Sequence, residues 1–264
     1  MTEKQHTANS VPIVEFIGGM GCGKSTIYKE LEQACSDTDL DWVLTRNKLI
    51  EKKHGEIFVR RDKRIFYKLT KLPVLRRFRA RFVTDELRML GKAKLSDAEY
   101  GKLIKVALFE RKRYEGKGSH ALNRVQYFIN DLYEISAIKE TTKNDNRIII
   151  LDEGIMQRCL SLLFRLEECD EFAEQYCNSV VHVPTLLIHV ETDKELALKR
   201  LVERGKKRDV HIEVLDTAVE MSKKIVQHMQ ARGSFVLKLD GAEDPSANAR
   251  KCLDKIRAVA EQLR

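Results

Sequence analysis

The chain has 264 residues and a mass of 30.5 kDa, a size that suits one large domain or two small ones. Hydrophobic residues make up 43% of it and charged residues 33%, which supplies a buried core and excludes a wholly disordered chain. The formal charge of +8 is concentrated in residues 46–82, where fourteen basic and three acidic residues give +11 against −3 for the remainder. We therefore expect an anionic partner at this segment.

The sequence predicts neither a membrane span nor a secretory leader. No apolar run approaches the ~18 residues that a spanning helix needs. Residues 1–10 are polar, and we expect them to form a disordered N-terminal tail. Six cysteines occur without a Cys-x-x-Cys pair, which favours reduced thiols over a zinc ribbon or a disulfide framework. These features predict a cytoplasmic protein, with peripheral attachment to a membrane through residues 46–82 left open.

The first chemical motif lies in residues 13–26, where a β-prone apolar run is followed by glycines and then by a helix-compatible stretch. Residues 18–25 fit the pattern G-x-x-x-x-G-K-[ST], in which backbone N–H groups and a helix N-terminus surround phosphate oxygens. We expect Lys24 to reach the β- and γ-phosphates of ATP and the Ser25 hydroxyl to ligate Mg²⁺. The predicted nucleotide-binding residues are Gly18, Gly19, Met20, Gly21, Cys22, Gly23, Lys24, Ser25 and Thr26.

A second motif, Arg-Ile-Ile-Ile-Leu-Asp-Glu-Gly at residues 147–154, predicts a buried strand followed by two acids. Four consecutive apolar residues suit a strand covered on both faces of a parallel sheet. Asp152 follows at the carboxyl end, where open α/β sheets bind ligands, and we expect it to hold Mg²⁺ directly or through water. Glu153 leaves two interpretations open: it orients an acceptor or polarises a water, or it is a solvated surface acid.

Five predicted strands separated by helical patterns indicate an α/β fold, a three-layer P-loop NTPase sandwich with a mostly parallel sheet. The strands are expected at residues 13–17, 42–45, 148–151, 185–190 and 235–239. Residues 11–264 are expected to form a single domain. In it, residues 46–146 form a basic, mostly helical insertion between the second and third strands and act as an acceptor lobe. A capping box at Ser96–Glu99 opens one of its predicted helices.

An amphipathic helix is expected after the fourth strand, and it carries Arg200, Arg204 and Arg208 at a spacing of four residues. Gly205 is expected to end this helix before the third arginine. Guanidinium groups so spaced can clamp a transferring phosphoryl group and neutralise its charge. The alternative is a solvated basic face paired with neighbouring acids. The predicted catalytic residues are Lys24, Asp152, Glu153, Arg200 and Arg204.

These motifs together resemble P-loop kinases of the nucleoside monophosphate kinase superfamily, and among them thymidylate kinases. Residues 16–26 resemble the family's F-E-G-x-D-G-x-G-K-S-T, and residues 41–46 resemble its strand that ends in L-T-R-E-P. Residues 151–157 stand where the family carries D-R-Y, and residues 187–208 resemble its strand, helix and arginine-bearing LID. The resemblance implies ATP and Mg²⁺ as cofactors, Arg46 on the acceptor side, and a homodimer.

The chain departs from the thymidylate kinase pattern at the residues that contact the acceptor. Ile17 and Met20 replace the acids of the family's P-loop, and Asp152-Glu153-Gly154 replaces D-R-Y. The resemblance therefore extends to the fold and to phosphoryl transfer, and it does not extend to thymidylate as the acceptor.

Basic and apolar residues alternate between Arg60 and Phe82, and Leu72-Pro73 divides this stretch into two predicted amphipathic helices. Three interpretations are open. The apolar stripe packs on a core beneath a solvated basic face, the stretch binds an anionic acceptor, or it forms a membrane-surface or nucleic-acid patch.

The combined pattern predicts an ATP-dependent phosphotransferase, a P-loop kinase that moves the γ-phosphoryl group of ATP·Mg to an anionic or phosphorylated, nucleotide-like small molecule. Two alternatives are kept. One is a P-loop ATPase in which Glu153 activates water, and the other is a kinase acting on a nucleic-acid end or on a membrane-associated glycan. A GTPase is disfavoured because the base-recognition motif N-K-x-D is missing from the sequence.

Overall fold

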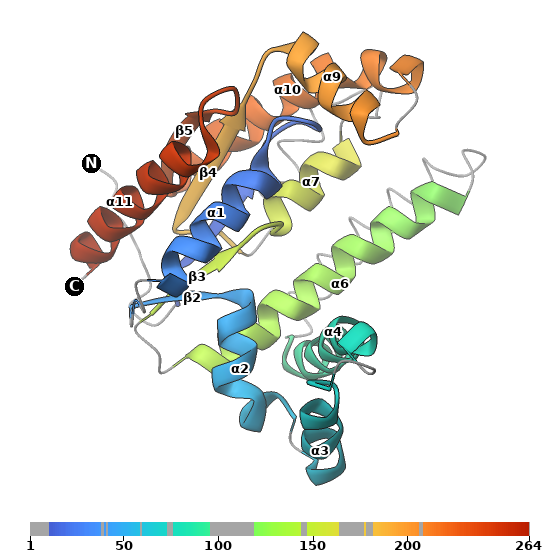
Figure 1. Cartoon of the computed structure of the whole chain (residues 1–264), viewed down its shortest axis with the longest axis vertical. Coiled ribbons are helices and arrows are strands. Elements are labelled where there is room, and N and C mark those ends of the chain that lie inside the picture. The colour runs from blue at the N-terminus through green and yellow to red at the C-terminus, as the bar shows by residue number, and fades with distance from the viewer. Residues whose placement is uncertain are drawn as a thin grey trace. The chain divides into compact units, whose positions relative to one another are not determined.

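A computed structural model describes residues 11–37, 40, 42–58, 60–72, 76–95, 119–143, 147–163, 177, 182–205 and 208–263. Each strand in this part of the chain is followed by one or more helices (Figure 1). In order, the elements are β1 (Ile13–Ile17), α1 (Lys24–Asp37), β2 (Val43–Thr45), α2 (Arg46–Ile57), α3 (Arg61–Leu69), α4 (Arg76–Lys94), α6 (Ser119–Thr142), β3 (Ile148–Leu151), α7 (Ile155–Leu163), β4 (Leu186–Glu191), α9 (Lys194–Glu203), α10 (Arg208–Ala231), β5 (Phe235–Asp240) and α11 (Pro245–Leu263).

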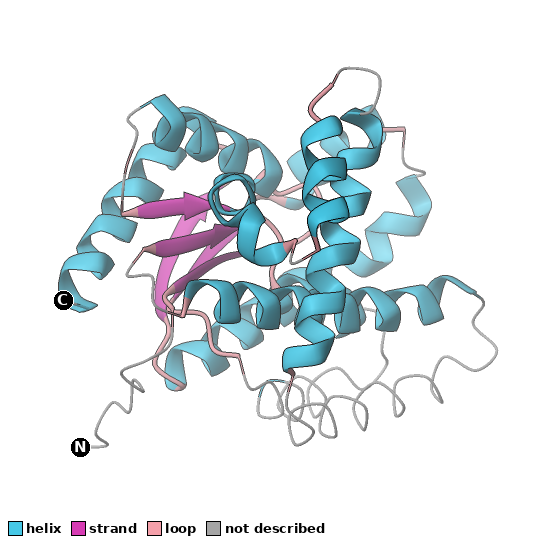
Figure 2. Cartoon of the chain, turned by 90° about the horizontal axis from the view of Figure 1, so that it is seen from below, coloured by secondary structure: helices cyan, strands magenta, loops and turns pink. Residues whose placement is uncertain are grey.

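The strands form one sheet, drawn in magenta in Figure 2. It has five strands in the order β2-β3-β1-β4-β5. β4 pairs in parallel with β1, where Val14 lies opposite Leu186, and with β5, where Leu187 lies opposite Val236. Every residue of β1, β2 and β3 is buried, which is typical of parallel strands covered on both faces. The predicted fold class and the five predicted strands are confirmed.

Helices cover both faces of this sheet. α1 connects β1 to β2, toward one edge, whereas α7 and α10 lie in the connections from β3 to β4 and from β4 to β5, toward the other edge. Because crossover connections between parallel strands are right-handed, α1 lies on one face and α7 and α10 lie on the opposite face. α11 packs against α1, and α7 packs against α10, which completes the outer layers.

The chain divides into two compact units. We call Pro12–Val43 with Ile150–Arg264 the sheet unit, and Leu44–Ile149 the helical unit. The helical unit contains α2, α3, α4 and α6, so the insertion predicted at residues 46–146 is helical where the structure describes it. The capping box at Ser96–Glu99 and the tail at residues 1–10 lie outside the described residues. Folding of residues 11–264 as a single domain stays a prediction.

The helical unit has an aromatic core of its own. Phe58 and Tyr67 are fully buried with ring centroids 4.8 Å apart, and Phe82 stacks on Phe58 at 5.3 Å. The core residues of the cluster are Ile50, Ile57, Phe58, Tyr67, Val83, Leu87 and Ala137. The interpretation that the apolar stripe packs on a core is therefore correct for Phe58 and Phe82. Ile65, Leu69 and Leu72 are exposed instead, and Phe66, although 39% exposed, contacts the ring of Phe82 at a centroid distance of 4.7 Å.

None of the helices in the described ranges combines the length and the apolar character that crossing a membrane requires.

Candidate functional site

The loop between β1 and α1 is held in shape by close backbone contacts that only glycine permits. Gly21 has a φ of 77°, and a Cβ atom there would lie 2.6 Å from the carbonyl oxygen of Ala197. A Cβ atom on Gly18 would lie 2.2 Å from the carbonyl oxygen of Val190. Since both neighbours are backbone atoms, neither can move aside for a side chain. Gly18 and Gly21 are thus required by the way β4 and α9 pack on the loop.

Lys24 places its charge within this loop. Its Nζ donates hydrogen bonds to the carbonyl oxygens of Gly18 at 2.7 Å and Gly19 at 2.9 Å, and it lies 3.4 Å from Cys22 Sγ. α1 begins at Lys24, and the exposed Ser25 hydroxyl follows in its first turn. An ammonium group and the N-terminus of a 14-residue helix are therefore concentrated at one short loop.

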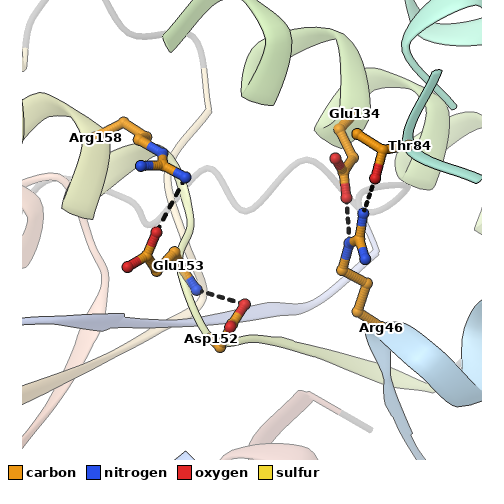
Figure 3. Close-up of polar contacts among 6 residues, drawn as sticks. All are labelled: Arg46, Thr84, Glu134, Asp152, Glu153 and Arg158. Atoms are coloured by element: carbon orange, nitrogen blue, oxygen red, sulfur yellow. Dashed lines mark hydrogen bonds and ion pairs between the residues drawn. The ribbon is translucent and has the colours of Figure 1, made fainter. Parts of the chain in front are cut away.

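Asp152 and Glu153 follow β3, the strand next to β1 in the sheet. Asp152 is exposed, and its Oδ1 accepts a hydrogen bond of 2.8 Å from the backbone N–H of Glu153. Glu153 Oε2 pairs with Arg158 Nη2 of α7 at 3.0 Å (Figure 3). The two neighbouring acids therefore have different surroundings, because Asp152 is oriented by its own turn and Glu153 by an ion pair.

A buried carboxylate in β1, which sequence reasoning missed, anchors the start of α7. Glu15 is fully buried, its Oε1 lies 2.7 Å from His182 Nε2, and its Oε2 accepts a hydrogen bond of 3.0 Å from Met156 N. A Cβ atom on Gly154 would lie 2.1 Å from Glu15 Cδ, so the turn packs directly on the carboxylate. Glu15 thus connects the strand that precedes residues 18–25, the predicted phosphate-binding loop, with the turn that follows Asp152.

Gln157 provides a second connection of this kind. Its Oε1 accepts a hydrogen bond of 3.1 Å from the N–H of Gly18, and this contact is buried. α7 therefore contacts both β1, through Glu15, and the first glycine of the loop. The sequence carried a sign of the first contact, because an acid inside the apolar run Ile-Val-Glu-Phe-Ile must find a partner when it is buried. It carried no comparable sign for Gln157.

Arg200 contacts the loop from the side of α9. Its Nη1 donates to the carbonyl oxygen of Gly21 at 3.3 Å, and its Nη2 donates to that of Gly241 at 3.0 Å. A Cβ atom on Gly241 would lie 1.8 Å from the carbonyl oxygen of Cys22, so the turn after β5 packs on the loop as well. Arg200 therefore joins α9, the phosphate-binding loop and the turn after β5. Its predicted contact with a transferring phosphoryl group stays a prediction.

The other two arginines of the predicted clamp lie on either side of a helix break. α9 ends at Glu203, and Gly205 has a φ of 73°, so the predicted break is confirmed. Arg204 is exposed at this end. Arg208 is the first residue of α10, and its side chain lies outside the described part.

Arg46, the predicted acceptor residue, is the first residue of α2 in the helical unit. Its Nε forms an ion pair with Glu134 of α6, and its Nη2 donates to Thr84 Oγ1 of α4 at 3.1 Å (Figure 3). In these contacts Arg46 holds three helices together. Its contact with an acceptor stays a prediction.

A cavity of about 330 Å³ in the sheet unit reaches the phosphate-binding loop at Gly19, Met20 and Cys22. Its other walls come from the end of β4 and from α9 and α10. The apolar lining includes Met20, Leu215 and Val219, and the carboxylates are Glu191, Asp216 and Glu220. Lys194 also lines the cavity and forms an ion pair with Asp216.

His189 of β4 lies beside this cavity and is 1% exposed. Its Nε2 lies 3.0 Å from Ser222 Oγ, and its Nδ1 lies 3.6 Å from Glu191 Oε1. Burial, helped by the charges of Lys238, Lys223 and Lys24, lowers the pKa of His189 to about 4, although the carboxylate of Glu191 opposes the shift. The imidazole is therefore neutral at pH 7.

Comparison with known proteins gives structural neighbours only. No protein-family model matches the chain, and no curated protein matches it. The deoxyadenosine kinase from M. mycoides with bound dATP has a TM-score of 0.47 at 13% sequence identity, covering 93% of this chain and 99% of that one. The same enzyme with bound dCTP has a TM-score of 0.45 at 13% identity, with the same coverage. At such scores and identities we take nothing about activity from these neighbours.

Proposed function

We propose that this protein is an ATP-dependent phosphotransferase, a P-loop kinase that moves the γ-phosphoryl group of ATP·Mg to a small-molecule acceptor. The observation that carries the proposal is the position of the Lys24 ammonium, which donates to the Gly18 and Gly19 carbonyls within the loop. The loop opens a helix, and Asp152 follows the neighbouring strand of the same sheet. This combination of cation, helix N-terminus and carboxylate suits a nucleoside triphosphate with its metal ion.

The residues present fit ATP·Mg. Ser25 and Asp152 are both exposed and would supply a hydroxyl and a carboxylate oxygen to Mg²⁺. Mg²⁺ in phosphoryl-transfer sites is held by one or two such groups together with phosphate oxygens and water. No group of three or more His, Cys, Asp or Glu side chains gathers into a metal site among the residues that the structure describes. When bound, Mg²⁺ would neutralise charge on the phosphates.

Catalysis in this proposal is mainly positional and electrostatic, because the phosphoryl group passes through a loose transition state. Lys24 would stabilise the charge on the phosphate oxygens, and the exposed Arg204 could approach them from the end of α9. Arg200 would act through its hydrogen bond to Gly21 and so fix the shape of the loop. Glu15 and Gln157 would hold the loop and the turn after Asp152 in register with each other.

Glu153 gives less support to the ATPase alternative. A water-activating base needs a carboxylate that can turn toward a water beside the γ-phosphate. The Glu153 carboxylate instead pairs with Arg158 at 3.0 Å, an ordinary ion-pair distance. We therefore assign Glu153 to the support of α7 and propose transfer to an acceptor over transfer to water.

Two classes of acceptor are supported by the residues of the chain. The basic composition of residues 46–82 supports an anionic or phosphorylated, nucleotide-like acceptor. The cavity that reaches Met20 is lined by three carboxylates, which suits an acceptor presenting hydroxyl or amino groups, such as a sugar. A thymidylate-kinase-like assembly as a homodimer remains part of the proposal, and its support is the sequence resemblance.

The test is ATP turnover by the purified full chain, alone and with a panel of acceptors. The panel holds nucleoside monophosphates, nucleosides, neutral and phosphorylated sugars, and oligonucleotides with a free 5′-hydroxyl. We expect turnover to rise sharply with one class, with one labelled phosphate appearing in the acceptor for each ADP formed. Steady turnover that no acceptor changes would contradict the kinase and favour the ATPase. A chain that binds no ATP·Mg would contradict both.

A further inference from the structure

The helix α3 exposes large apolar side chains on its surface. Nine large hydrophobic residues are exposed in the described part of the chain, and five of them fall between residues 65 and 78. Four belong to α3 and the turn after it, and we call Ile65, Phe66, Leu69 and Leu72 the α3 patch. Their exposed fractions run from 39% to 53%. Such a concentration exceeds the scattered single residues that ordinary surfaces carry.

Ile65 and Leu69, at the centre of the α3 patch, face away from the core of the helical unit, whereas the ring of Phe66 at its edge contacts Phe82 at a centroid distance of 4.7 Å. Tyr67 and Thr70 are buried and mark the inward side of α3. Ile65 and Leu69 each lie two residues from Tyr67, which is about 200° around an α-helix with 3.6 residues per turn. The centre of the patch is therefore on the outward side of a helix whose inward side is already packed on Phe58.

Basic side chains border this patch. Arg61 and Lys68 are exposed and lie beside Ile65 and Leu69 on the helix. Residues 60–72 carry six basic residues and one acidic residue, Asp62. α3 lies next to α4 in the helical unit (Figure 1). A helix that presents aliphatic and aromatic side chains between lysines and arginines is typical of segments that lie in the interface of a lipid bilayer.

We propose that the α3 patch docks on a membrane surface that carries anionic lipids. Ile65, Leu69 and Leu72 would enter the boundary between headgroups and acyl chains, and Arg61 and Lys68 would contact lipid phosphates. Each contribution is separate, because the apolar side chains leave water and the basic ones gain from the negative surface potential. Every residue in the inference belongs to α3 and its following turn, so it does not depend on the loop at residues 18–25, although Arg61 and Lys68 also belong to the basic segment 46–82 that supports an anionic acceptor.

The charge and the side-chain types of the α3 patch favour an anionic membrane over two other occupants, a nucleic acid and a second copy of the chain. A nucleic acid would satisfy the basic residues, but it offers aliphatic side chains such as Leu69 and Leu72 no partner comparable to the aromatic stacking that it favours. A second copy of the chain would bring its own residues 46–82, each set with a net charge of +11, against the first. An anionic bilayer satisfies both the charges and the apolar side chains.

The experiment is flotation of the full chain with vesicles of phosphatidylcholine alone and of phosphatidylcholine mixed with phosphatidylglycerol. We expect binding to the mixed vesicles and little binding to phosphatidylcholine. The double variant Ile65→Asn with Leu69→Asn should lower partitioning at least about tenfold. Met89→Asn is the matched control, because Met89 is 66% exposed on α4, outside the patch, and its change should leave partitioning as in the parent chain.

A second set of variants changes the basic residues and so tests the proposal independently of the apolar substitutions. Arg61→Glu with Lys68→Glu should lower partitioning about tenfold or more, and added salt should weaken binding by the parent chain. The control is Lys29→Glu with Arg257→Glu, two exposed basic residues of the sheet unit, which should bind as the parent does. Thermal unfolding of every variant checks that it is folded.

Several results would overturn the proposal. The first is that the parent chain does not bind the mixed vesicles. The second is that the asparagine variant binds them as well as the parent does. A third is tighter binding to single-stranded oligonucleotides than to the mixed vesicles, lost in both the asparagine and glutamate variants, which would assign the patch to nucleic acid. Self-association of the parent chain that disappears in the asparagine variant would assign it to a second copy.

Discussion

The sheet unit and the helical unit both contain residues whose polarity does not match their surroundings, but these residues differ in type and in burial. In the sheet unit such residues are polar and buried. Glu15 and Gln157 lie inside it, and each has a partner near the phosphate-binding loop. In the helical unit they are apolar and exposed. Ile65 and Leu69 lie on the outward side of α3, although a buried aromatic core is available on the other side.

This contrast shows that a residue whose polarity does not match its surroundings can indicate a structural or binding role. Burying a carboxylate without partners is costly. The partners that the buried Glu15 carboxylate must have therefore indicate the contact between β1 and α7, which supports the loop. Exposing aliphatic side chains beside one another is also unfavourable, and it identifies a surface that another body covers. In our proposals, the first role is directed inward and supports phosphoryl transfer, and the second is directed outward and places the protein on a membrane surface.

The largest expected effect is the difference in unfolding free energy between substitutions on the two sides of α3. Tyr67→Ala should lower the free energy of unfolding by about 4 kcal/mol, because it removes a buried ring that packs on Phe58 and accepts a hydrogen bond from Arg79. Ile65→Ala, on the exposed side, should change it by less than about 0.5 kcal/mol. Denaturant unfolding of both variants measures this. Equal losses would show that the α3 patch is packed against protein.

The pH dependence of stability tests the surroundings of His189 in the sheet unit. The unfolded chain protonates this imidazole near pH 6.5 and the folded chain only near pH 4. Between these values the unfolded state binds more protons, so the free energy of unfolding should fall by up to about 3 kcal/mol as the pH falls. His189→Gln should flatten this part of the profile, and His228→Gln, at a partly exposed site on α10, should not. An unchanged slope in the first variant would contradict a neutral, buried His189.

The contact between Gly154 and Glu15 can be tested by a substitution that adds one methyl group at residue 154. Gly154→Ala should cost about 2 to 3 kcal/mol of unfolding free energy, because its Cβ would lie 2.1 Å from Glu15 Cδ and the carboxylate is held on both sides. Gly19→Ala is the matched control for stability, since its Cβ would meet only Val219 Cγ2 at 3.6 Å. Thermal and denaturant unfolding compare the two. A tolerated Gly154→Ala would show that Glu15 does not anchor this turn.

The smallest of these effects concerns the hydrogen bond from Gly18 to Gln157. Gln157→Leu leaves the buried N–H of Gly18 without its acceptor, and we expect a loss of about 2 kcal/mol together with weaker binding of ATP·Mg. Gln33→Leu, which changes an exposed amide on α1, should affect neither quantity. Unfolding and nucleotide titration check both. Unchanged affinity in Gln157→Leu would show that α7 stabilises the fold without shaping the loop.

Much of the sheet unit could be predicted from the sequence, because its patterns are local. Continuous apolar runs such as Ile148–Leu151 indicate buried strands, and the spacing from Gly18 to Ser25 fixes the loop between a strand and a helix. The end of α9 before Gly205 was equally visible. Each of these predictions depends on residues within a few positions of one another.

The contacts that complete the site depend on residues far apart in the sequence. Gln157 and Gly18 are 139 positions apart, and Arg200 and Gly21 are 179 apart. No periodicity or spacing relates such residues. Sequence reasoning therefore offered Arg200 a contact with phosphate or a place on a solvated basic face, and it assigned no role to Gln157. For the same reason, the apolar pattern of residues 65–72 showed that α3 is amphipathic, and it did not show which side the core covers.

The central claim is that Lys24 acts on a phosphate, and one rate comparison tests it most directly. ADP formation from ATP·Mg is measured for the parent chain, Lys24→Ala and Lys29→Ala, each with the acceptor that stimulates the parent most. Lys29 is an exposed lysine one turn further along α1. We predict a rate at least about a hundredfold lower for Lys24→Ala, with unfolding almost unchanged, and a normal rate for Lys29→Ala. A normal rate in a folded Lys24→Ala chain would contradict the proposed site.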